Sequence, residues 1–424
     1  MILSLRIENF RSIKDPLTVN LTTEKRLKET DLPENSFIEK NNEILKSLLI
    51  YGRNASGKSN ILLALNALVF LVRRSDRYKH EEAIGPYEPF IFNTEYSNKP
   101  VKFEIDFITV EAKTKFKYIV EFNHKSIVFE GLYIYPEGIK SKLYERNTSS
   151  ISYGDYYQGT KKKIEDDLLP NQLFLSKSAT SKVKYLDDCY LYFIKYIYVS
   201  IIDESNHDLK FIRFISEVLT KDNKLRTNLL ELLKASDTSI KDFNIKENET
   251  EIKFPNNIPE GIKKSFLDQY KYEVSTSHIL FKNGNEIGQE TLDLEMESSG
   301  TKKIFTIGAL ILKTLDNGGV IVIDELDKGL HPLISKLLIN LFNSKKNNPK
   351  NAQLIFATHD SSLLDLESLR RDQISFVDKE YEGNSIFYKL SDIKGIRKDI
   401  PLDKWYLSGR FKAIPITSEV NLIF

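Results

Sequence analysis

The chain contains several short stretches in which apolar and polar residues alternate, the pattern of strands that bury one face. These stretches are residues 2–9, 17–21, 101–107, 116–122 and 126–135. The last three follow one another closely, so we expect them to form an antiparallel meander, which marks a β-subdomain. Two further stretches, residues 22–44 and 85–100, are polar or rich in turn residues and are expected to be loops, the first of them at the surface.

Three other stretches are apolar without alternation, as in parallel strands that are buried on both faces. They are residues 48–50, 319–323 and 354–357. The second is followed by Asp324 and Glu325, and the third by Thr358, His359 and Asp360. Open α/β sheets bind their ligands at the carboxyl ends of the strands, so these polar residues mark a candidate site. Two more strands, over 374–377 and 385–390, are expected in the tail.

Apolar residues at helical spacing predict seven helices. They cover residues 61–71, 164–175, 185–197, 209–219, 225–235, 303–315 and 332–342. Four of the seven fall between about 140 and 285, where we expect an inserted, mainly helical lobe. Residues 241–281 of this lobe mix short strands with polar turns. We therefore predict an α/β fold divided into residues 1–140, 141–285 and 286–424.

The 424 residues, 41% apolar and 29% charged, have the composition of an ordinary soluble globular protein. A net charge of +1 argues against a nucleic-acid surface over the whole chain but leaves room for local basic patches. Cys189 is the single cysteine, so we expect no intrachain disulfide and interpret it as a small buried residue in a reducing cytosol. We find neither a signal peptide nor the roughly 20 apolar residues of a membrane span, and expect a cytoplasmic protein with no membrane partner.

Residues 52–59 read GRNASGKS and lie between the strand 48–50 and the helix 61–71. This is the phosphate loop G-x-x-x-x-G-K-S, with every fixed position filled and in the right context. Gly52 and Gly57 let successive backbone N–H groups turn toward an anion, and the helix that follows presents its positive end. Lys58 can then reach the β- and γ-phosphates, while the Ser59 hydroxyl can complete a Mg²⁺ shell.

The polar residues at the two strand ends fit the same chemistry. Asp324 can hold Mg²⁺ through water, and Glu325 can orient or deprotonate the attacking water. Alone, two acids after a strand could be plain surface charges, but beside a phosphate loop we interpret them as catalytic. A lone His at a strand end is usually a satisfied hydrogen-bonding group; here His359 is expected to sense the γ-phosphate, because its ring would share the sheet edge with Lys58.

Residues 297–301, ESSGT, form a small-residue turn just before the helix 303–315. A hydroxyl and free N–H groups at a helix N-terminus make an anion site. Ser298 could also be no more than an N-cap. Its position just upstream of the Asp-Glu strand favours a phosphate-binding signature.

The strings GRNASGKS, ESSGT, VIVIDELDKGLHP and FATHD, with NFRS near the start, together resemble the ABC-type ATPase heads of the SMC and RecF group. They are most similar to the AAA family ATPases of the OLD and abortive-infection (AbiL, RloA, AriA-like) kind. The resemblance covers roughly residues 1–140 and 285–424. It implies an ABC-type P-loop NTPase head with an antiparallel β-subdomain and an inserted lobe, and ATP and Mg²⁺ as cofactors. It also implies that two subunits sandwich ATP, in a head-to-tail homodimer or a higher homo-oligomer.

The motifs and the resemblance assign roles to individual positions. Catalytic roles go to Lys58, Glu325 and His359, and Mg²⁺ binding goes to Ser59 and Asp324. ATP contacts are expected from the phosphate loop of one subunit and the signature of the other: Gly52, Asn54, Ala55, Ser56, Gly57, Lys58, Ser59, Asn60, Ser298, Gly300 and Thr301. Arg11 could contact nucleotide or the neighbouring subunit, or be a surface charge beside the core residue Phe10.

The sequence also differs from the ABC-type ATPase heads that it resembles. No sustained heptads separate the phosphate loop from the signature, which excludes a chromosome-tethering coiled-coil rod. The signature reads SSGT where transporters have SGGQ, and His331 and Pro332 stand where many heads have an Asp. The communication role of that Asp is therefore in doubt here. No Gln occurs between Ser59 and Gln158, so a Gln loop is not identifiable, and the aromatic loop 85–96 is the candidate for its place.

The leading hypothesis is a mechanochemical ATPase whose dimer closes on ATP and reopens on hydrolysis. The resemblance implies a bacterial anti-phage system of the abortive-infection type, in which this subunit controls a separate effector such as a nuclease. Past Arg371 the acids show no D-x-D pattern of a nuclease. The alternative is a RecF-like repair ATPase that binds DNA, with the basic runs 161–163 and 221–226 as candidate contacts. A third class is a nucleotide-gated binding module with almost no turnover.

Overall fold

The computed structural model describes all residues except 28–31, 201–206, 249–257, 262, 264–270 and 415–424. The chain forms two compact units. The first unit consists of Met1–Ile201, Asn317–Leu326 and Ile339–Phe424, and the second of Ile202–Asp316 and Asp327–Leu338. These boundaries differ from the expected divisions at 140 and 285. The stretch expected as one inserted lobe is shared between the units, because residues 141–200 pack onto the core of the first unit.

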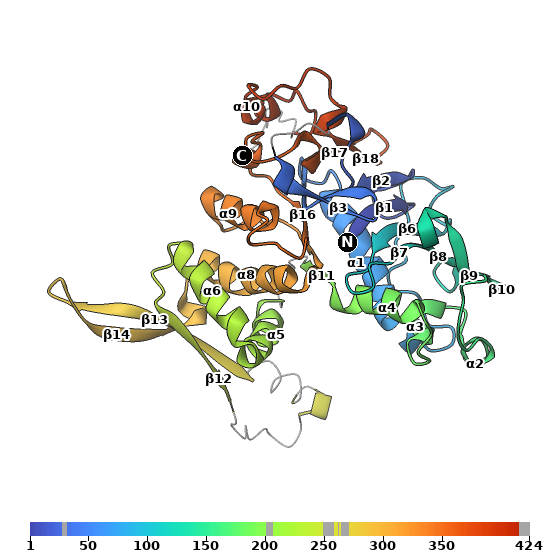
Figure 1. Cartoon of the computed structure of the whole chain (residues 1–424), viewed down its shortest axis with the longest axis horizontal. Coiled ribbons are helices and arrows are strands. Elements are labelled where there is room, and N and C mark those ends of the chain that lie inside the picture. The colour runs from blue at the N-terminus through green and yellow to red at the C-terminus, as the bar shows by residue number, and fades with distance from the viewer. Residues whose placement is uncertain (28–31, 201–206, 249–257, 262, 264–270, 415–424) are drawn as a thin grey trace, which may run out of the picture. The chain divides into compact units, whose positions relative to one another are not determined.

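A six-stranded sheet carries the polar strand ends of the first unit (Figure 1). Its order is β11 (Ile197–Ser200), β15 (Val320–Ile323), β16 (Gln353–Ala357), β5 (Ser47–Gly52), β17 (Ile374–Lys379) and β18 (Ser385–Lys389). The first five strands are parallel, and β18 runs antiparallel to β17. Every residue of β5, β15 and β16 is buried, which explains why their sequences do not alternate. The prediction of buried parallel strands is confirmed.

The second sheet of the first unit is antiparallel and has seven strands. Its order is β10 (Ile151–Tyr153), β9 (Ser141–Asn147), β8 (Ile127–Ile134), β7 (Lys115–Phe122), β6 (Val101–Ile108), β1 (Ile2–Glu8) and β2 (Leu17–Asn20). The predicted meander is confirmed as β6, β7 and β8, and the N-terminal strand β1 extends it by pairing with β6. One hydrophobic core joins both sheets to the helix α1 (Lys58–Arg74), through residues such as Ile50, Leu65, Phe107 and Val322. The predicted α/β fold with an antiparallel β-subdomain is therefore confirmed.

Two predictions for the first unit were wrong. Residues 22–44 are not only a loop, because they include most of a hairpin of β3 (Ser36–Glu39) and β4 (Asn42–Leu45). Ile38 in β3 is 75% exposed, whereas Ile44 and Leu45 in β4 are fully buried, so the buried apolar residues of the hairpin lie mainly in its second strand. Residues 164–175 do not form one helix. They are split between α2 (Lys162–Asp166) and α3 (Phe174–Ser178), with Pro170 in the break, where a helix would lose a hydrogen bond.

Two further helices of this unit are α4 (Leu186–Lys195) and α10 (Leu402–Leu407). A third helix, α9 (Pro332–Asn343), is divided between the units, because the second unit extends to Leu338 and the first resumes at Ile339. α4 and α9 agree with the predicted helices over 185–197 and 332–342. No described helix of the chain is long and apolar enough to cross a membrane.

The second unit contains helices and a sheet, and the first two strands of that sheet begin within residues 241–281, where the sequence predicts short strands. Among its described residues the helices include α5 (His207–Lys221), α6 (Asn223–Ala235) and α8 (Ser299–Asn317), and the antiparallel sheet has the order β12 (Asp242–Glu247), β13 (Tyr272–Lys282), β14 (Asn285–Asp293). Nearly every residue of β14 is exposed, so this strand carries no apolar alternation to predict it. α6 and α8 pack closely: a Cβ on Gly308 would lie 2.8 Å from Leu232 Cδ2.

Candidate functional site

The turn between β5 and α1 is built on two glycines that no other residue could replace without a shift of the backbone. Gly57 has φ 109°, and a Cβ there would lie 2.1 Å from Ser385 Oγ. A Cβ on Gly52 would lie 2.5 Å from Val377 O and 2.6 Å from Ser56 Oγ. The loop is therefore pressed against β17 and β18, and its curl is fixed by the sheet beneath it.

Lys58 is the first residue of α1 and is buried. Its Nζ donates hydrogen bonds to Gly52 O at 2.8 Å and to Arg53 O at 3.2 Å, which holds the ammonium in the curl of the loop. Asn54 and Ala55 are exposed, and Ala55 has a left-handed φ of 62°. Gly57 occupies the N-cap without a side-chain cap, so the first N–H groups of α1 are left for an anion.

The strand ends predicted to meet do lie at one edge of the sheet. The register pairs Ile323 with Phe356 and Ala357 with Ile50. The ladder continues past the strands, because Leu326 N donates to Ala357 O at 3.3 Å and Thr358 N donates to Ile50 O at 3.1 Å. Asp324, Glu325 and His359 therefore follow directly at the edge where β5 enters the phosphate loop.

Asp324 and Glu325 have different surroundings. Asp324 is 9% exposed, and its Oδ1 is buried with no hydrogen-bond partner among the described residues. A buried carboxylate oxygen without a donor suits a divalent cation, and carboxylate and hydroxyl oxygens are ligands that Mg²⁺ accepts. Asp324 and Ser59 therefore fit the expected metal. Glu325 is half-buried with φ 51°, a conformation that costs a residue with a side chain about 1 kcal/mol and occurs often at functional sites.

His359 lies beyond the last buried residue of its strand. Thr358 is fully buried, and its Oγ1 accepts a hydrogen bond from Asp360 N at 3.0 Å. Asp360 in turn caps the short turn that follows, accepting from Ser362 N at 2.9 Å. The backbone on either side of His359 is thus fixed, while the residue itself is exposed.

The NFRS string packs against the start of α1. Arg11 forms an ion pair with Glu88 and donates from NH1 to Asn60 Oδ1 at 3.4 Å. Asn60 Nδ2 donates to Ser12 Oγ at 2.7 Å. Arg11 is therefore bonded to a phosphate-loop neighbour and to the aromatic loop, whichever of its two predicted roles it has. Both side chains of the ion pair are more than a third exposed, so the pair itself contributes little stability.

One residue of this network carries no signal in the sequence. Ser385 Oγ donates to Ser56 O at 2.6 Å and bonds to Ser12 Oγ at 2.7 Å. A single Ser far along the chain is not a motif, so only the structure could find these contacts. Asn9, the first residue of the NFRS string, holds the end of the aromatic loop and the residues after it, because its Nδ2 donates to three backbone oxygens: those of Tyr96, Lys99 and Pro100.

The signature ESSGT lies in the second unit, at the start of α8. Ser298 Oγ accepts a hydrogen bond from Thr301 N at 3.1 Å and bonds to Thr301 Oγ1 at 2.8 Å, so Ser298 does act as an N-cap. Ser298 and Ser299 are exposed. A Cβ on Gly300 would lie 2.7 Å from Gly329 O, which places the signature beside the loop that follows the Asp-Glu pair.

Glu297, which precedes the cap, is held by β13. Its Oε1 accepts a hydrogen bond from Thr276 Oγ1 at 2.5 Å and lies 2.7 Å from His278 Nε2. Neither Thr276 nor His278 was expected to belong to the site. The two residues tie the antiparallel sheet of the second unit directly to the start of the signature.

His331 and the basic runs have local partners. His331 Nδ1 accepts a hydrogen bond from Leu333 N at 3.2 Å, so its side chain caps the start of α9. In the run 221–226, three cations pair with carboxylates: Lys221 with Glu217, Lys224 with Asp316 and Arg226 with Asp242. In the run 161–163, the Lys161 ammonium lies 4.6 Å from the centre of the Tyr153 ring.

The site combines a strand, a glycine loop and a helix that bury a lysine with two neighbouring parallel strands that end in polar and acidic residues. This combination defines a P-loop nucleoside triphosphatase domain. The chain belongs to the family described as "AAA domain, putative AbiEii toxin, Type IV TA system", whose profile matches residues 47–365. Among solved structures it is similar to the SMC head domain from Thermotoga maritima, at 13% identity, over 92% of this chain and 98% of that one, with a TM-score of 0.39. No curated protein matches the chain.

Proposed function

We propose that the protein binds ATP with Mg²⁺ at the carboxyl edge of the six-stranded sheet and hydrolyses it. One observation carries the proposal: the loop that holds Lys58 and the strand ends that carry Asp324, Glu325 and His359 lie at one sheet edge. The family supports it, because P-loop ATPase domains use nucleotide and usually Mg²⁺.

Each residue has a role that its chemistry permits. Lys58 and the N–H groups of the loop neutralise the β- and γ-phosphates, and Glu325 accepts a proton from the attacking water. His359 donates to the γ-phosphate from the exposed end of its strand. Asp324 and the Ser59 hydroxyl would hold Mg²⁺, which when bound supplies further neutralisation of phosphate charge.

Removal of the metal or of its buried ligand tests this assignment. We expect Asp324→Asn to lower the rate of phosphate release roughly 100-fold, because the amide keeps the size of the side chain but loses the charge that holds Mg²⁺. EDTA should have the same effect on the wild type, and added Mg²⁺ should reverse it. The matched control is Asp106→Asn, which changes a partly buried carboxylate bonded to Lys117 on the antiparallel sheet. Equal loss in the control, or full activity in EDTA, would refute the assignment.

We propose further that two copies share each ATP, the phosphate loop of one copy facing the signature of the other. The exposed hydroxyls of Ser298 and Ser299 at the start of α8, a helix of 19 residues, support this, since they and the helix N-terminus suit an anionic ligand. The sequence resemblance to dimeric heads supports it as well. The dimer would then close when it binds ATP and reopen when it hydrolyses ATP, and this movement would be its mechanical output.

For the biological role, we propose a regulator that controls a separate effector, such as a nuclease, in an anti-phage system of the abortive-infection type. The family description, which names a toxin of a type IV toxin–antitoxin system, supports this role, as does the resemblance of the motifs. Identification of the genes beside this one tests the proposal. A nuclease or toxin reading frame would support it, whereas a replication or recombination gene would support the RecF-like alternative.

A further inference from the structure

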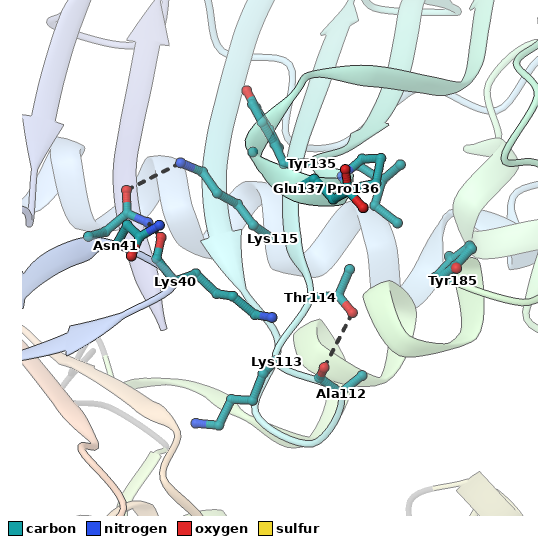
Figure 2. A pocket seen from close by; sticks show the side chains of 13 residues that line it. Lys40, Asn41, Ala112, Lys113, Thr114, Lys115, Tyr135, Pro136, Glu137 and Tyr185 are labelled. Atoms are coloured by element: carbon teal, nitrogen blue, oxygen red, sulfur yellow. Dashed lines mark hydrogen bonds between the residues drawn. The ribbon is translucent and has the colours of Figure 1, made fainter.

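A pocket of about 620 Å³ lies in the first unit, between loops of the seven-stranded sheet and the turn of the β3–β4 hairpin (Figure 2). Its walls are the turn between β3 and β4, the turn between β6 and β7, the connection from β8 to β9, and Tyr185 at the start of α4. None of the residues assigned to the ATPase site lines it. The volume falls within the roughly 300–1,000 Å³ typical of ligand pockets.

The hairpins that form this pocket are tied together. The turn at Lys40 and Asn41 has φ of 48° and 60°, as in a two-residue hairpin turn, and Asn42 Nδ2 fixes it by donating to Lys40 O at 2.7 Å. Lys115 Nζ donates to Asn42 Oδ1 at 3.3 Å, and Lys113 Nζ lies 3.1 Å from Glu39 Oε2. The pocket is therefore preformed, with two links between its hairpins.

Positive charge predominates in the pocket. Its lining includes the ammonium groups of Lys40, Lys113 and Lys115 and a single carboxylate, Glu137. Lys40 forms no ion pair within the described part of the chain, and its side chain extends from the turn toward the β6–β7 turn in Figure 2. The contacts of Lys115 are the Asn42 amide and the Tyr135 ring, whose centre is 4.9 Å away.

Two neighbouring lysines outside the pocket are paired with acids: Lys117 bonds to Glu104 and Asp106, and Lys142 lies 3.7 Å from Glu145. Lys113, inside the pocket, is likewise paired with Glu39, so the positive charge of the lining that has no acidic partner among the described residues is carried by Lys40 and Lys115. Burial, followed by the charge of Asp106, raises the pKa of Tyr135, so its phenol stays neutral.

We propose that this pocket binds a phosphate group of a nucleotide-sized ligand, with Lys40 and Lys115 as its main cationic contacts. Lysine ammonium groups bind phosphate as point charges. The phosphate could come from a free nucleotide or from the backbone of a single nucleic-acid strand, which present the same group. The site is additional to the proposed ATPase site and does not depend on it.

The test uses the full-length protein and two probes. A labelled oligothymidylate is followed by fluorescence anisotropy, and the phosphorylated dinucleotide pTpT by titration calorimetry. The variant Lys40→Ala/Lys115→Ala is compared with the matched double variant Lys140→Ala/Lys142→Ala, which removes the same charge outside the pocket. The single variant Lys40→Glu changes an exposed turn residue, so it keeps the test valid if the double variant folds poorly. Thermal unfolding shows whether each variant remains folded.

We expect the pocket variants to bind roughly tenfold more weakly than the wild type, and the slope of log affinity against log salt to fall by about 1. The control double variant should bind as the wild type does. Binding of both probes identifies a phosphate of a small ligand, and binding of the oligonucleotide alone identifies a strand backbone. The proposal is overturned if the wild type binds neither probe, or if the control double variant loses as much affinity as the pocket variants.

Discussion

Glu325→Gln is expected to lower ATP hydrolysis about 1,000-fold while leaving ATP affinity unchanged. The amide keeps the size of the side chain and its place after β15, but it cannot accept the proton of the attacking water. ATP should therefore persist in the site and hold two copies together. Light scattering after size exclusion should show a dimer with ATP and a monomer without nucleotide.

The matched control for this change is Glu367→Gln, which alters an exposed acid on a loop of the same unit. It should hydrolyse ATP at the wild-type rate. If Glu325→Gln instead left a slow wild-type rate unaltered, the protein would be a nucleotide-gated binding module with almost no turnover. If the variant bound ATP and stayed monomeric, the proposed ATP sandwich would be contradicted.

Lys58→Ala is expected to weaken ATP binding at least 100-fold. The substitution removes a buried charge that Gly52 O and Arg53 O hold within the loop, and a charge-assisted contact to phosphate contributes about 3 kcal/mol. Equilibrium binding of a fluorescent ATP analogue measures the effect. Lys345→Ala, at an exposed position after α9, is the control and should bind normally. Wild-type affinity in Lys58→Ala would remove the main support for the site.

The parts of the fold that the sequence predicted depend on residues that lie close together in the chain. The phosphate loop is a contiguous string whose glycines are required by backbone geometry, with Gly57 at φ 109°. β15 and β16 were predictable because strands buried on both faces are apolar at every position. Once those strands were known to be parallel, the meeting of Asp324, Glu325 and His359 at one edge followed from the rule for open sheets.

The parts that the sequence did not predict depend on partners far away in the chain. Ser385 meets Ser12 across 373 positions, and no pattern near either residue points to the other. β14 has almost no buried residue, so it lacks the alternation by which strands are found. The helix expected over 164–175 is broken at Pro170, which the sequence does show, and a distant partner adds a second reason: Glu130, buried in the antiparallel sheet, accepts from Phe174 N and Leu175 N and so fixes where α3 begins.

The central claim is that one copy's phosphate loop and another copy's signature act on the same ATP. Mixing two inactive variants, Lys58→Ala and Ser298→Arg, and measuring phosphate release tests this claim most directly. Each variant alone should be inactive. In a mixed dimer one site combines the intact loop with the intact signature, so the mixture should regain roughly a quarter of the wild-type rate, as expected when random pairing makes half of the dimers mixed. A mixture that stays as inactive as its two components would contradict the account.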